Sequence, residues 1–350
     1  MQMYSCRRCP ADSPGAATIR SIALVSPVLD DWGSFAALIG EISNKFTGSD
    51  FRFHVCAIDD GSVTAIDLPS IALTGDTCIA QIEIIHLALN LGHQRAIAVG
   101  LCEIADREQI DAVIVMDSDG EDRPVDIGAL LATAQQCPGQ IILAERTKRS
   151  ETLRFRFGYL LYKLLFRAMT GRAINFGNFS LLPTPAVRRL VRMPELWNHL
   201  AASVIRSRFS YLTVPTVRGD RFQGKSTMNL VSLIVHGLSA LSVHADLIFV
   251  RVLVGLSLLA VLAAFGIAAV AAIRFLTDLA IPGWATTVAG DLLIILFQIF
   301  AIVIAVSLMM LAGRSNRPII PVLEYHHYIT SREFWGLNQI DTEMGSRSRI

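Results

Sequence analysis

The sequence lacks several features that would place it in common protein classes. No G-x-G-x-x-G loop follows the first predicted strand, which excludes a dinucleotide-binding Rossmann domain, because that fold needs the loop to hold a pyrophosphate. The first 18 residues contain no apolar run of signal-peptide type, so we expect residues 1–18 to be disordered and the N-terminal domain to stay in the cytoplasm. Internal repeats are absent, and the net charge of +1 gives no indication of a nucleic-acid partner.

Cysteine is sparse, with six residues at positions 6, 9, 56, 78, 102 and 137. Cys6 and Cys9 form a C-x-x-C pair, but no second pair or histidine cluster completes a zinc site. All six positions lie in the part of the chain predicted to be cytoplasmic. We therefore expect reduced thiols.

Two long apolar runs lie towards the C-terminal end. Residues 252–273 carry no charge, and residues 292–312 contain Gln298 as their only strongly polar side chain. At about 1.5 Å per residue, each run can cross a hydrocarbon core of roughly 30 Å. A buried helix of a soluble protein is the alternative, which two uncharged runs of this length disfavour. The sequence thus predicts a two-helix transmembrane domain over residues 246–312.

The basic residues around these runs predict their orientation. Arg251 precedes the first run, and Arg314 and Arg317 follow the second, whereas the connecting loop 274–291 holds one arginine against two aspartates. Cytoplasmic flanks carry the excess of basic residues. We therefore expect an inner-membrane protein with both termini in the cytoplasm, including a tail over 313–350.

Ahead of the apolar runs, short β-rich segments alternate with helical stretches. The predicted strands are 21–28, 51–58, 82–86, 111–116 and 140–144, and the predicted helices are 34–46, 93–106 and 124–136. This alternation predicts a doubly wound α/β domain whose mostly parallel sheet is covered on both faces.

Acidic side chains follow two of the predicted strands. Residues 117–122 contain four carboxylates directly after strand 111–116, and Asp59-Asp60 closes the second strand. Open α/β folds bind ligands at this edge of the sheet. Mg²⁺ or Mn²⁺ would relieve the repulsion among the carboxylates and is commonly shared with phosphates, so a metal-bound nucleotide is the predicted ligand. The alternative is a solvated acidic turn in which Asp122 caps a helix that begins at Pro124.

Two further stretches are amphipathic. Residues 145–172 hold eight lysines and arginines against two glutamates, interleaved with leucine and phenylalanine. The pattern predicts a basic helix at a membrane interface, with an ordinary core helix as the alternative. A second amphipathic helix is predicted over 228–245, leading into the first apolar run. In the polar tail, Tyr325-His-His-Tyr and Phe334-Trp335 are interpreted as an interfacial aromatic patch and not as a metal site.

Seven short segments carry a family resemblance: Ser26-Pro-Val, Ile58-Asp-Asp-Gly-Ser, Asn90-Leu-Gly-His-Gln-Arg-Ala, Val115-Met-Asp-Ser-Asp-Gly-Glu-Asp-Arg-Pro, Ala144-Glu-Arg, Asn175-Phe-Gly-Asn-Phe-Ser-Leu-Leu and Arg218-Gly-Asp-Arg-Phe-Gln-Gly-Lys-Ser. In this order, over roughly residues 19 to 245, they resemble the polyprenyl-phosphate glycosyltransferases. These are inverting enzymes of glycosyltransferase family two with a GT-A fold, such as dolichol-phosphate mannose synthase and the bacterial bactoprenol glucosyltransferases.

The resemblance implies a GT-A catalytic domain over 19–227, followed by the interfacial helices and the two transmembrane helices. It implies transfer of a sugar from a UDP- or GDP-linked donor to a polyprenyl phosphate, with Mg²⁺ or Mn²⁺ as cofactor. The implied partners are the nucleotide sugar, the lipid phosphate and the membrane. A homo-oligomer is left open.

The resemblance also implies roles for individual residues. Asp117 and Asp119 resemble the family's D-x-D pair, and Glu121 occupies the position of the glutamine that follows this pair beside the metal. The resemblance therefore implies these three residues as metal ligands. The implied nucleotide-binding residues are Pro27, Asp59, Asp60, Gly61, Ser62, Gly92, His93 and Asp117. Arginines would meet phosphates, and the predicted catalytic set is Asp119, Arg146, Arg154, Arg156, Arg218, Arg221, Asn175 and Asn178.

The sequence departs from the family pattern at several positions. Leu29-Asp30-Asp31 replaces Tyr-Asn-Glu, Gly120-Glu121 replaces Leu-Gln, and Asn175 and Asn178 replace the aspartates of a D-x-G-D motif. Lys225 is displaced from its usual place. These departures motivate one alternative, a catalytically idle membrane scaffold or partner subunit that kept the fold. A processive polysaccharide synthase would need a Gln-x-x-Arg-Trp segment and more spans, and the sequence has neither.

Overall fold

A computed structural model describes residues 19–64, 66, 77–146, 167–171, 176–223, 237–277, 283–315 and 317–335. The predicted N-terminal disorder, most of the basic helix 145–172 and the first half of the helix 228–245 lie outside these residues. The chain divides into two compact units, and the first contains residues 1–160, 174–243 and 319–350. The second contains residues 161–173 and 244–318.

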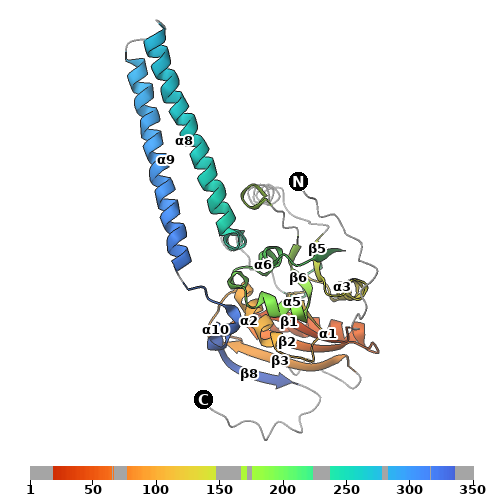
Figure 1. Ribbon diagram of the computed structural model, residues 1–350. Helices are drawn as coiled ribbons and strands as arrows, with labels where there is room; N and C mark the ends of the chain where they lie inside the picture. The colour runs from red at the N-terminus through yellow and green to blue at the C-terminus, as the bar shows by residue number, and fades with distance from the viewer. Residues whose placement is uncertain are drawn as a thin grey trace. The chain divides into compact units, whose positions relative to one another are not determined.

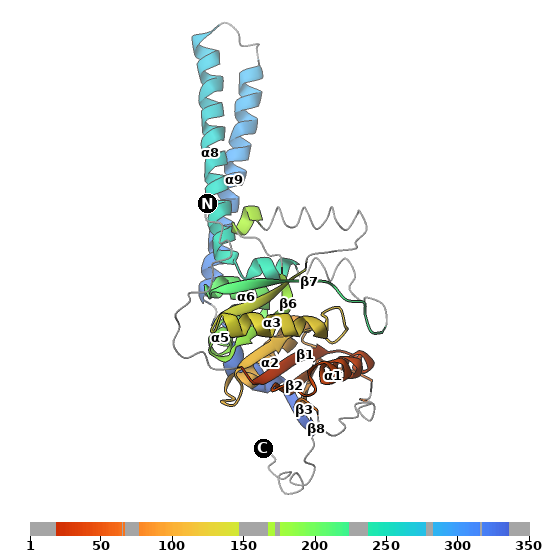
Figure 2. The ribbon, with the colours of Figure 1, turned by 90° about the vertical axis from the view of Figure 1, so that its right-hand side faces the viewer.

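The first unit is built on an eight-stranded sheet with the order β7-β5-β6-β4-β1-β2-β3-β8 (Figures 1 and 2). Its strands are β1 (Ser21–Val28), β2 (Arg52–Asp59), β3 (Ile79–Leu87), β4 (Ala112–Val115), β5 (Ile141–Arg146), β6 (Phe176–Pro183), β7 (Tyr211–Thr216) and β8 (Ile329–Trp335). Strands β1 to β4 pair in parallel, and β6 and β8 are antiparallel to their neighbours β4 and β3. The predicted mostly parallel α/β sheet is confirmed.

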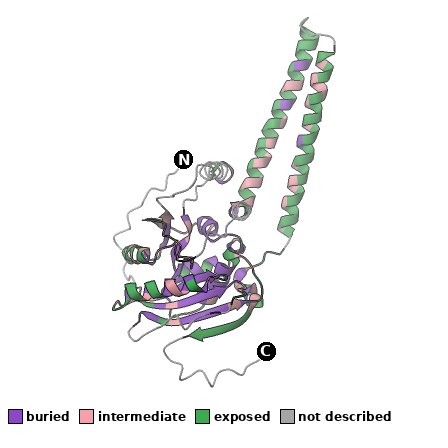
Figure 3. Cartoon of the chain, turned by 180° about the vertical axis from the view of Figure 1, so that it is seen from behind, coloured by how far each residue is buried: buried purple, intermediate pink, exposed green. Residues whose placement is uncertain are grey.

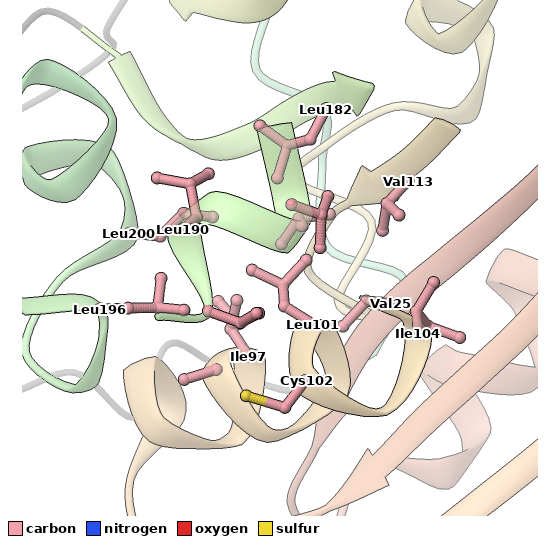
Figure 4. Close-up of a cluster of buried hydrophobic side chains, with 14 of the residues drawn as sticks. Val25, Ile97, Leu101, Cys102, Ile104, Val113, Leu182, Leu190, Leu196 and Leu200 are labelled. Carbon is pink, nitrogen blue, oxygen red and sulfur yellow. The ribbon is translucent and has the colours of Figure 1, made fainter. Parts of the chain in front are cut away.

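Helices cover both faces of this sheet because each presents one apolar side to it. Helices α1 (Trp32–Phe46) and α3 (Pro124–Gln136) belong to one buried cluster, which includes Phe35 and Leu130. Helices α2 (His93–Ala105), α5 (Thr184–Leu190) and α6 (Leu200–Ser207) share the other. Figure 4 shows this second cluster, with Leu101 and Ile104 of α2 beside Val25 of β1.

Strand β8 was missed by the sequence interpretation. It follows the second apolar run and pairs antiparallel with β3, so it forms the edge of the sheet. Ahead of it, α10 (Pro321–Glu324) and η3 (Tyr325–Tyr328) pack on the first unit: Tyr325 is buried in the α2 cluster, and the rings of Tyr328 and Trp197 lie 5.6 Å apart. The predicted interfacial aromatic patch is therefore wrong for Tyr325, which the protein core covers, whereas Tyr328 is only partly buried against that core.

The second unit consists chiefly of helices α8 (Ala245–Leu276) and α9 (Trp284–Ser315), each of 32 residues. Both are long and apolar enough to cross a membrane, and they contain the predicted spans 252–273 and 292–312. Only 11% and 6% of their most apolar windows is buried within the protein (Figure 3). A core helix of a soluble protein would be buried, so this alternative is disfavoured.

Among the four cysteines that the structure describes, one differs from its prediction. Cys56, Cys78 and Cys102 are buried free thiols, as expected, and burial raises the pKa of each. Cys137, which follows α3, is disulfide-bonded. A disulfide requires two Cβ atoms to lie within a few ångströms, and spacing along the chain does not reveal such proximity.

Two helical glycines provide a test of the packing between α2 and the sheet. A Cβ at Gly100 would lie 2.5 Å from Val25 Cγ1, whereas a Cβ at the exposed Gly40 of α1 meets nothing within 4 Å. We predict that Gly100→Ala lowers the free energy of unfolding by about 1 to 3 kcal/mol through overpacking. Gly40→Ala should raise it by about 0.5 to 1 kcal/mol through helix propensity. Denaturant titration of the two variants checks this, and equal effects would contradict the packing described.

Candidate functional site

Three loops meet where β1, β2 and β4 end. The amide of Asp60 donates to the carbonyl of Val28 over 2.9 Å, and Ser118 Oγ donates to the carbonyl of Pro27 over 3.3 Å. These strands are neighbours and parallel, so their carboxyl ends reach the same edge of the sheet. The sequence prediction that Asp59-Asp60 and the acidic segment 117–122 share this edge is consistent with this geometry.

Asp59 and Asp60 are both buried and bind different loops. Asp59 Oδ1 accepts from the amide of Ser62 over 2.8 Å, and its Oδ2 lies 2.8 Å from His86 Nδ1. Asp60 accepts from the amides of Leu91 and Gly92 over 2.7 and 3.0 Å, which holds the start of α2 against the end of β2. Burial raises the pKa of Asp60, although the two amides oppose the shift.

Glycine is required between these carboxylates and Ser62. Gly61 has a φ of +81°, and a Cβ there would lie 3.0 Å from the backbone nitrogen of Asn90. Both the left-handed backbone and the close approach of two loops exclude a larger side chain.

Asp30 has a structural role that the sequence interpretation missed. Its Oδ1 accepts from the amides of Val63 and Thr64 and from the Thr64 hydroxyl, at 2.8 to 2.9 Å. The hydrogen bond from the Thr64 amide contributes most to lowering the pKa of Asp30. Asp30 also has a φ of 53°, a conformation that aspartate tolerates better than most residues. At the position where the sequence departs from the family pattern, the Asp30 side chain therefore joins the loop after β1 to the loop after β2.

The acidic segment after β4 is paired with two arginines that follow β7. Arg221 Nη2 lies 2.5 Å from Asp119 Oδ2, and Arg221 Nε lies 3.3 Å from Glu121 Oε1, which also binds Arg218. The amides of Gly219 and Phe222 donate to the carbonyls of Glu121 and Asp119, both over 2.9 Å. We call residues 217–223 the arginine strap. Arg218 and Arg221 were predicted to meet phosphate, and here they pair with two carboxylates of the acidic segment.

The strap compensates the acidic segment only in part. Burial raises the pKa of Asp119, and the charges of Asp117 and Glu121 raise it further, while Arg221 lowers it. Three carboxylates in five residues are suitable donors for a hard cation. Among the described residues, however, no group of three His, Cys, Asp or Glu side chains is arranged to hold a metal ion. The predicted ligands Asp117, Asp119 and Glu121 therefore supply the right chemistry but are not preorganised.

Asp122 does not have the role given to it by the alternative interpretation. Helix α3 begins at Pro124, as predicted, but Arg123 is its N-cap residue and provides no side-chain cap. The Asp122 side chain is buried and accepts from the amide of Asp117 over 3.3 Å. Asp122 thus folds the acidic segment back on itself.

His93 and Asn178 connect α2 to β6. The Leu200 amide donates to Gln94 Oε1 over 2.8 Å, and Gln94 Nε2 donates to Asn178 Oδ1 over 3.0 Å. This chain of contacts turns Asn178 Nδ2 towards His93 Nε2, and these two atoms lie 3.0 Å apart. His93 Nε2 also lies 3.2 Å from Asp117 Oδ1. Burial lowers the pKa of His93, but the nearby carboxylates, Asp117 first, outweigh it and the pKa is raised.

The structure does not place every predicted site residue. Arg154, Arg156 and Asn175 lie outside the described residues, and of Arg146 only the backbone, at the end of β5, is described. The described predicted residues, from Pro27 to Arg221, are linked by the contacts above. Asp30, His86 and Gln94 were not predicted, and only their hydrogen bonds across the fold identify them.

No family model and no curated protein matches the chain. Among solved structures, it is similar to glucosyl-3-phosphoglycerate synthase from Mycobacterium tuberculosis in complex with Mn²⁺, UDP and glucosyl-3-phosphoglycerate, with 15% identity, a TM-score of 0.46, and coverage of 66% of this chain and 81% of the other. The same synthase with Mn²⁺ and UDP-glucose has 17% identity, a TM-score of 0.44, and coverage of 66% and 79%. Mannosyl-3-phosphoglycerate synthase from Rubrobacter xylanophilus has 13% identity, a TM-score of 0.45, and coverage of 65% and 73%.

The contacts of Asp30 lead to a prediction about pH. Because the pKa of Asp30 is lowered from 3.8, its ionised form stabilises the loop above that value, and the contribution is lost as the pH falls through the lowered pKa. We predict several-fold faster amide exchange at Val63 and Thr64 in Asp30→Asn, since charge-assisted hydrogen bonds are stronger than neutral ones. Hydrogen exchange at pH 7 measures this. Asp31→Asn is the matched control, because Asp31 makes no side-chain cap hydrogen bond.

Proposed function

We propose that the chain is a membrane-bound inverting glycosyltransferase. It moves a sugar from a nucleotide-diphosphate sugar to a polyprenyl phosphate at the cytoplasmic face of the inner membrane. One observation carries the proposal: buried carboxylates and the arginine strap converge at the carboxyl edge of an α/β sheet, in a chain that also has two helices of membrane-spanning length. Supporting it, Asp59, Asp60, Asp117 and Asp119 of the motifs that resemble the GT-A polyprenyl-phosphate enzymes follow or end strands β2 and β4.

The loops after β1 and β2 would form the nucleoside subsite. Asp59 ends β2 and Asp60 follows it, and their carboxylates are fixed by hydrogen bonds from Ser62, Leu91 and Gly92. Carboxylates held in this way can accept hydrogen bonds from a base or from ribose hydroxyls with little further ordering. A UDP- or GDP-linked donor is compatible with this subsite.

The acidic segment and the arginine strap would form the diphosphate subsite. Guanidinium groups match phosphate oxygens as well as they match carboxylates. When a diphosphate binds, Arg221 would therefore be able to pair with a phosphate oxygen in place of Asp119. The Asp119 carboxylate would then be free to bind a metal ion. Asp117, Asp119 and Glu121 would then hold Mg²⁺ or Mn²⁺. The bound ion would stabilise the negative charge that develops on the leaving diphosphate.

The proposed acceptor does not need a protein base. A phosphate monoester has its second pKa near 6 and is largely a dianion at pH 7, so its oxygen can attack the anomeric carbon without a protein base. The bond from that carbon to the diphosphate breaks, and the nucleoside diphosphate leaves with the electron pair. Asn178 is hydrogen-bonded through its side-chain amide to His93 and Gln94. Because this step needs no protein base, an asparagine can stand here in place of the family's aspartate.

An idle scaffold that kept the fold is the second candidate. The pairing of Asp119 and Glu121 with the strap favours it, because the predicted metal ligands are already compensated. The two candidates differ in nucleotide binding, which only the enzyme requires.

Transfer to lipid tests the proposed function. We expect the detergent-solubilised full chain, given radiolabelled UDP- and GDP-sugars, Mn²⁺ and undecaprenyl phosphate, to form a chloroform-extractable product. Excess EDTA should abolish the product. Asp119→Ala should reduce it at least about tenfold, as expected for loss of a ligand that stabilises the transition state.

Asp126→Ala is the matched control for Asp119→Ala. Asp126 pairs with Arg123 at the start of α3, and among the described residues no hydrogen bond or ion pair joins it to the strap. Transfer only to water-soluble acceptors would overturn the lipid assignment. Full activity in EDTA would overturn the metal assignment.

Strand β8 leads to a prediction about membrane topology. Residues on both sides of the apolar helices belong to the first unit, since β8 pairs with β3. If α8 and α9 both cross the membrane, the chain before 245 and after 315 lies on one side. We predict that a membrane-impermeant thiol reagent applied from the periplasm labels Trp284→Cys and does not label Ile340→Cys. Labelling of position 340 from outside would contradict the topology.

A further inference from the structure

A line of three polar side chains crosses the sheet from the nucleoside subsite to its edge. Asp59 on β2 lies directly opposite His86 on β3, and its Oδ2 is 2.8 Å from His86 Nδ1. On the next strand, Glu333 Oε1 lies 3.5 Å from His86 Nε2. Glu333 is opposite Ile84, two positions along β3 from His86, so the two side chains are diagonal neighbours on one face.

Burial decreases along this line. The side chains of Asp59, His86 and Glu333 are 9%, 19% and 49% exposed. The Nε2 atom of His86 is itself buried and has no hydrogen-bond partner in the described structure, so Glu333 approaches it at ion-pair distance only. The imidazole is therefore hydrogen-bonded to a buried carboxylate on its inner side and faces a half-exposed one on its outer side.

The geometry specifies how the imidazole acts on Asp59. An ionised carboxylate only accepts hydrogen bonds, so the contact at Nδ1 requires a proton on that nitrogen. Asp59 Oδ1 accepts from the Ser62 amide, and Oδ2 accepts from His86. With both oxygens engaged, the carboxylate plane is fixed, and the remaining lone pairs point in defined directions.

We propose that His86 is a positioning residue of the nucleotide site, and that Glu333, from the segment that follows the two apolar helices, orients it. This inference rests on the proposed function and deepens it. The nucleoside subsite is completed by residues more than 200 positions apart in the chain, and β8 contributes to donor affinity as well as covering a sheet edge.

Strand β8 also provides a matched control. Arg332 precedes Glu333, and its side chain lies on the opposite face of the sheet, where Nη2 is 3.0 Å from Glu103 Oε2 on α2. Substituting Arg332 removes an ion pair between β8 and the domain without touching His86. It therefore measures how much the docking of β8 alone contributes.

The experiment uses the full chain in detergent with Mn²⁺. Calorimetry with UDP and GDP measures affinity, and steady-state assays measure KM and kcat for the nucleotide sugar. We expect His86→Ala to weaken nucleotide binding about tenfold or more, as for loss of a hydrogen bond to a charged group. Glu333→Gln should weaken it about two- to fivefold, as for a partly exposed pair. KM for the nucleotide sugar should rise in proportion, while kcat and KM for the lipid phosphate stay within about twofold.

Two further variants separate positioning from stability. His86→Asn keeps a donor near the Nδ1 position and should restore most of the affinity lost in His86→Ala. Arg332→Gln should leave nucleotide affinity unchanged. If His86→Ala does not fold, Glu333→Gln against Arg332→Gln still decides the question, because both changes lie on the edge strand.

The outcomes are distinct. Wild-type nucleotide affinity in both His86→Ala and Glu333→Gln would overturn the inference. A loss of affinity in Arg332→Gln equal to that in Glu333→Gln would also overturn it, because it would show that only the docking of β8 matters. Absence of UDP and GDP binding by the wild-type chain would overturn the proposed function itself and this inference with it.

Discussion

The structure depends on how like charges are tolerated at one edge of a parallel sheet. Parallel strands bring the residues that follow them to the same place, and here they bring Asp59, Asp60, Asp117, Asp119 and Glu121 together. Each carboxylate is offset differently: Asp60 by backbone amides, Asp59 by an amide and an imidazole, and Asp119 by a guanidinium. The loops are ordered around these carboxylates by hydrogen bonds and ion pairs.

The sequence was sufficient for the elements that have strong local signals. Helix α3 occupies the predicted residues 124–136 because proline fixes its start, and the strands that precede the acidic residues are apolar and β-branched. The site was predictable in composition but not in pairing. Arg221 binds Asp119 across more than 100 residues, and no local pattern indicates such a contact. Asp30 was interpreted as a departure from a motif, whereas its effect is to fasten a loop over 30 residues further along.

Strand β8 was not predictable for a different reason. Its sequence, Ile-Thr-Ser-Arg-Glu-Phe-Trp, shows no alternation of apolar and polar residues, and almost all of it is exposed. An edge strand of this kind is stabilised by its backbone ladder with β3 and by pairs such as Arg332 with Glu103. Hydrophobic periodicity detects burial and does not detect backbone pairing. Tyr325, before it, was misplaced for another reason, because aromatic residues suit a protein core as well as a membrane interface.

The position of β8 in the chain has a consequence for synthesis. It is the last strand that the structure describes, and it follows two helices of 32 residues each. While the ribosome is making those helices, β3 has an unpaired edge, and an open edge is a template for pairing with other chains. The nascent domain is therefore prone to aggregation until β8 emerges. A chain that terminates early, before residue 329, would keep that exposed edge for its whole lifetime.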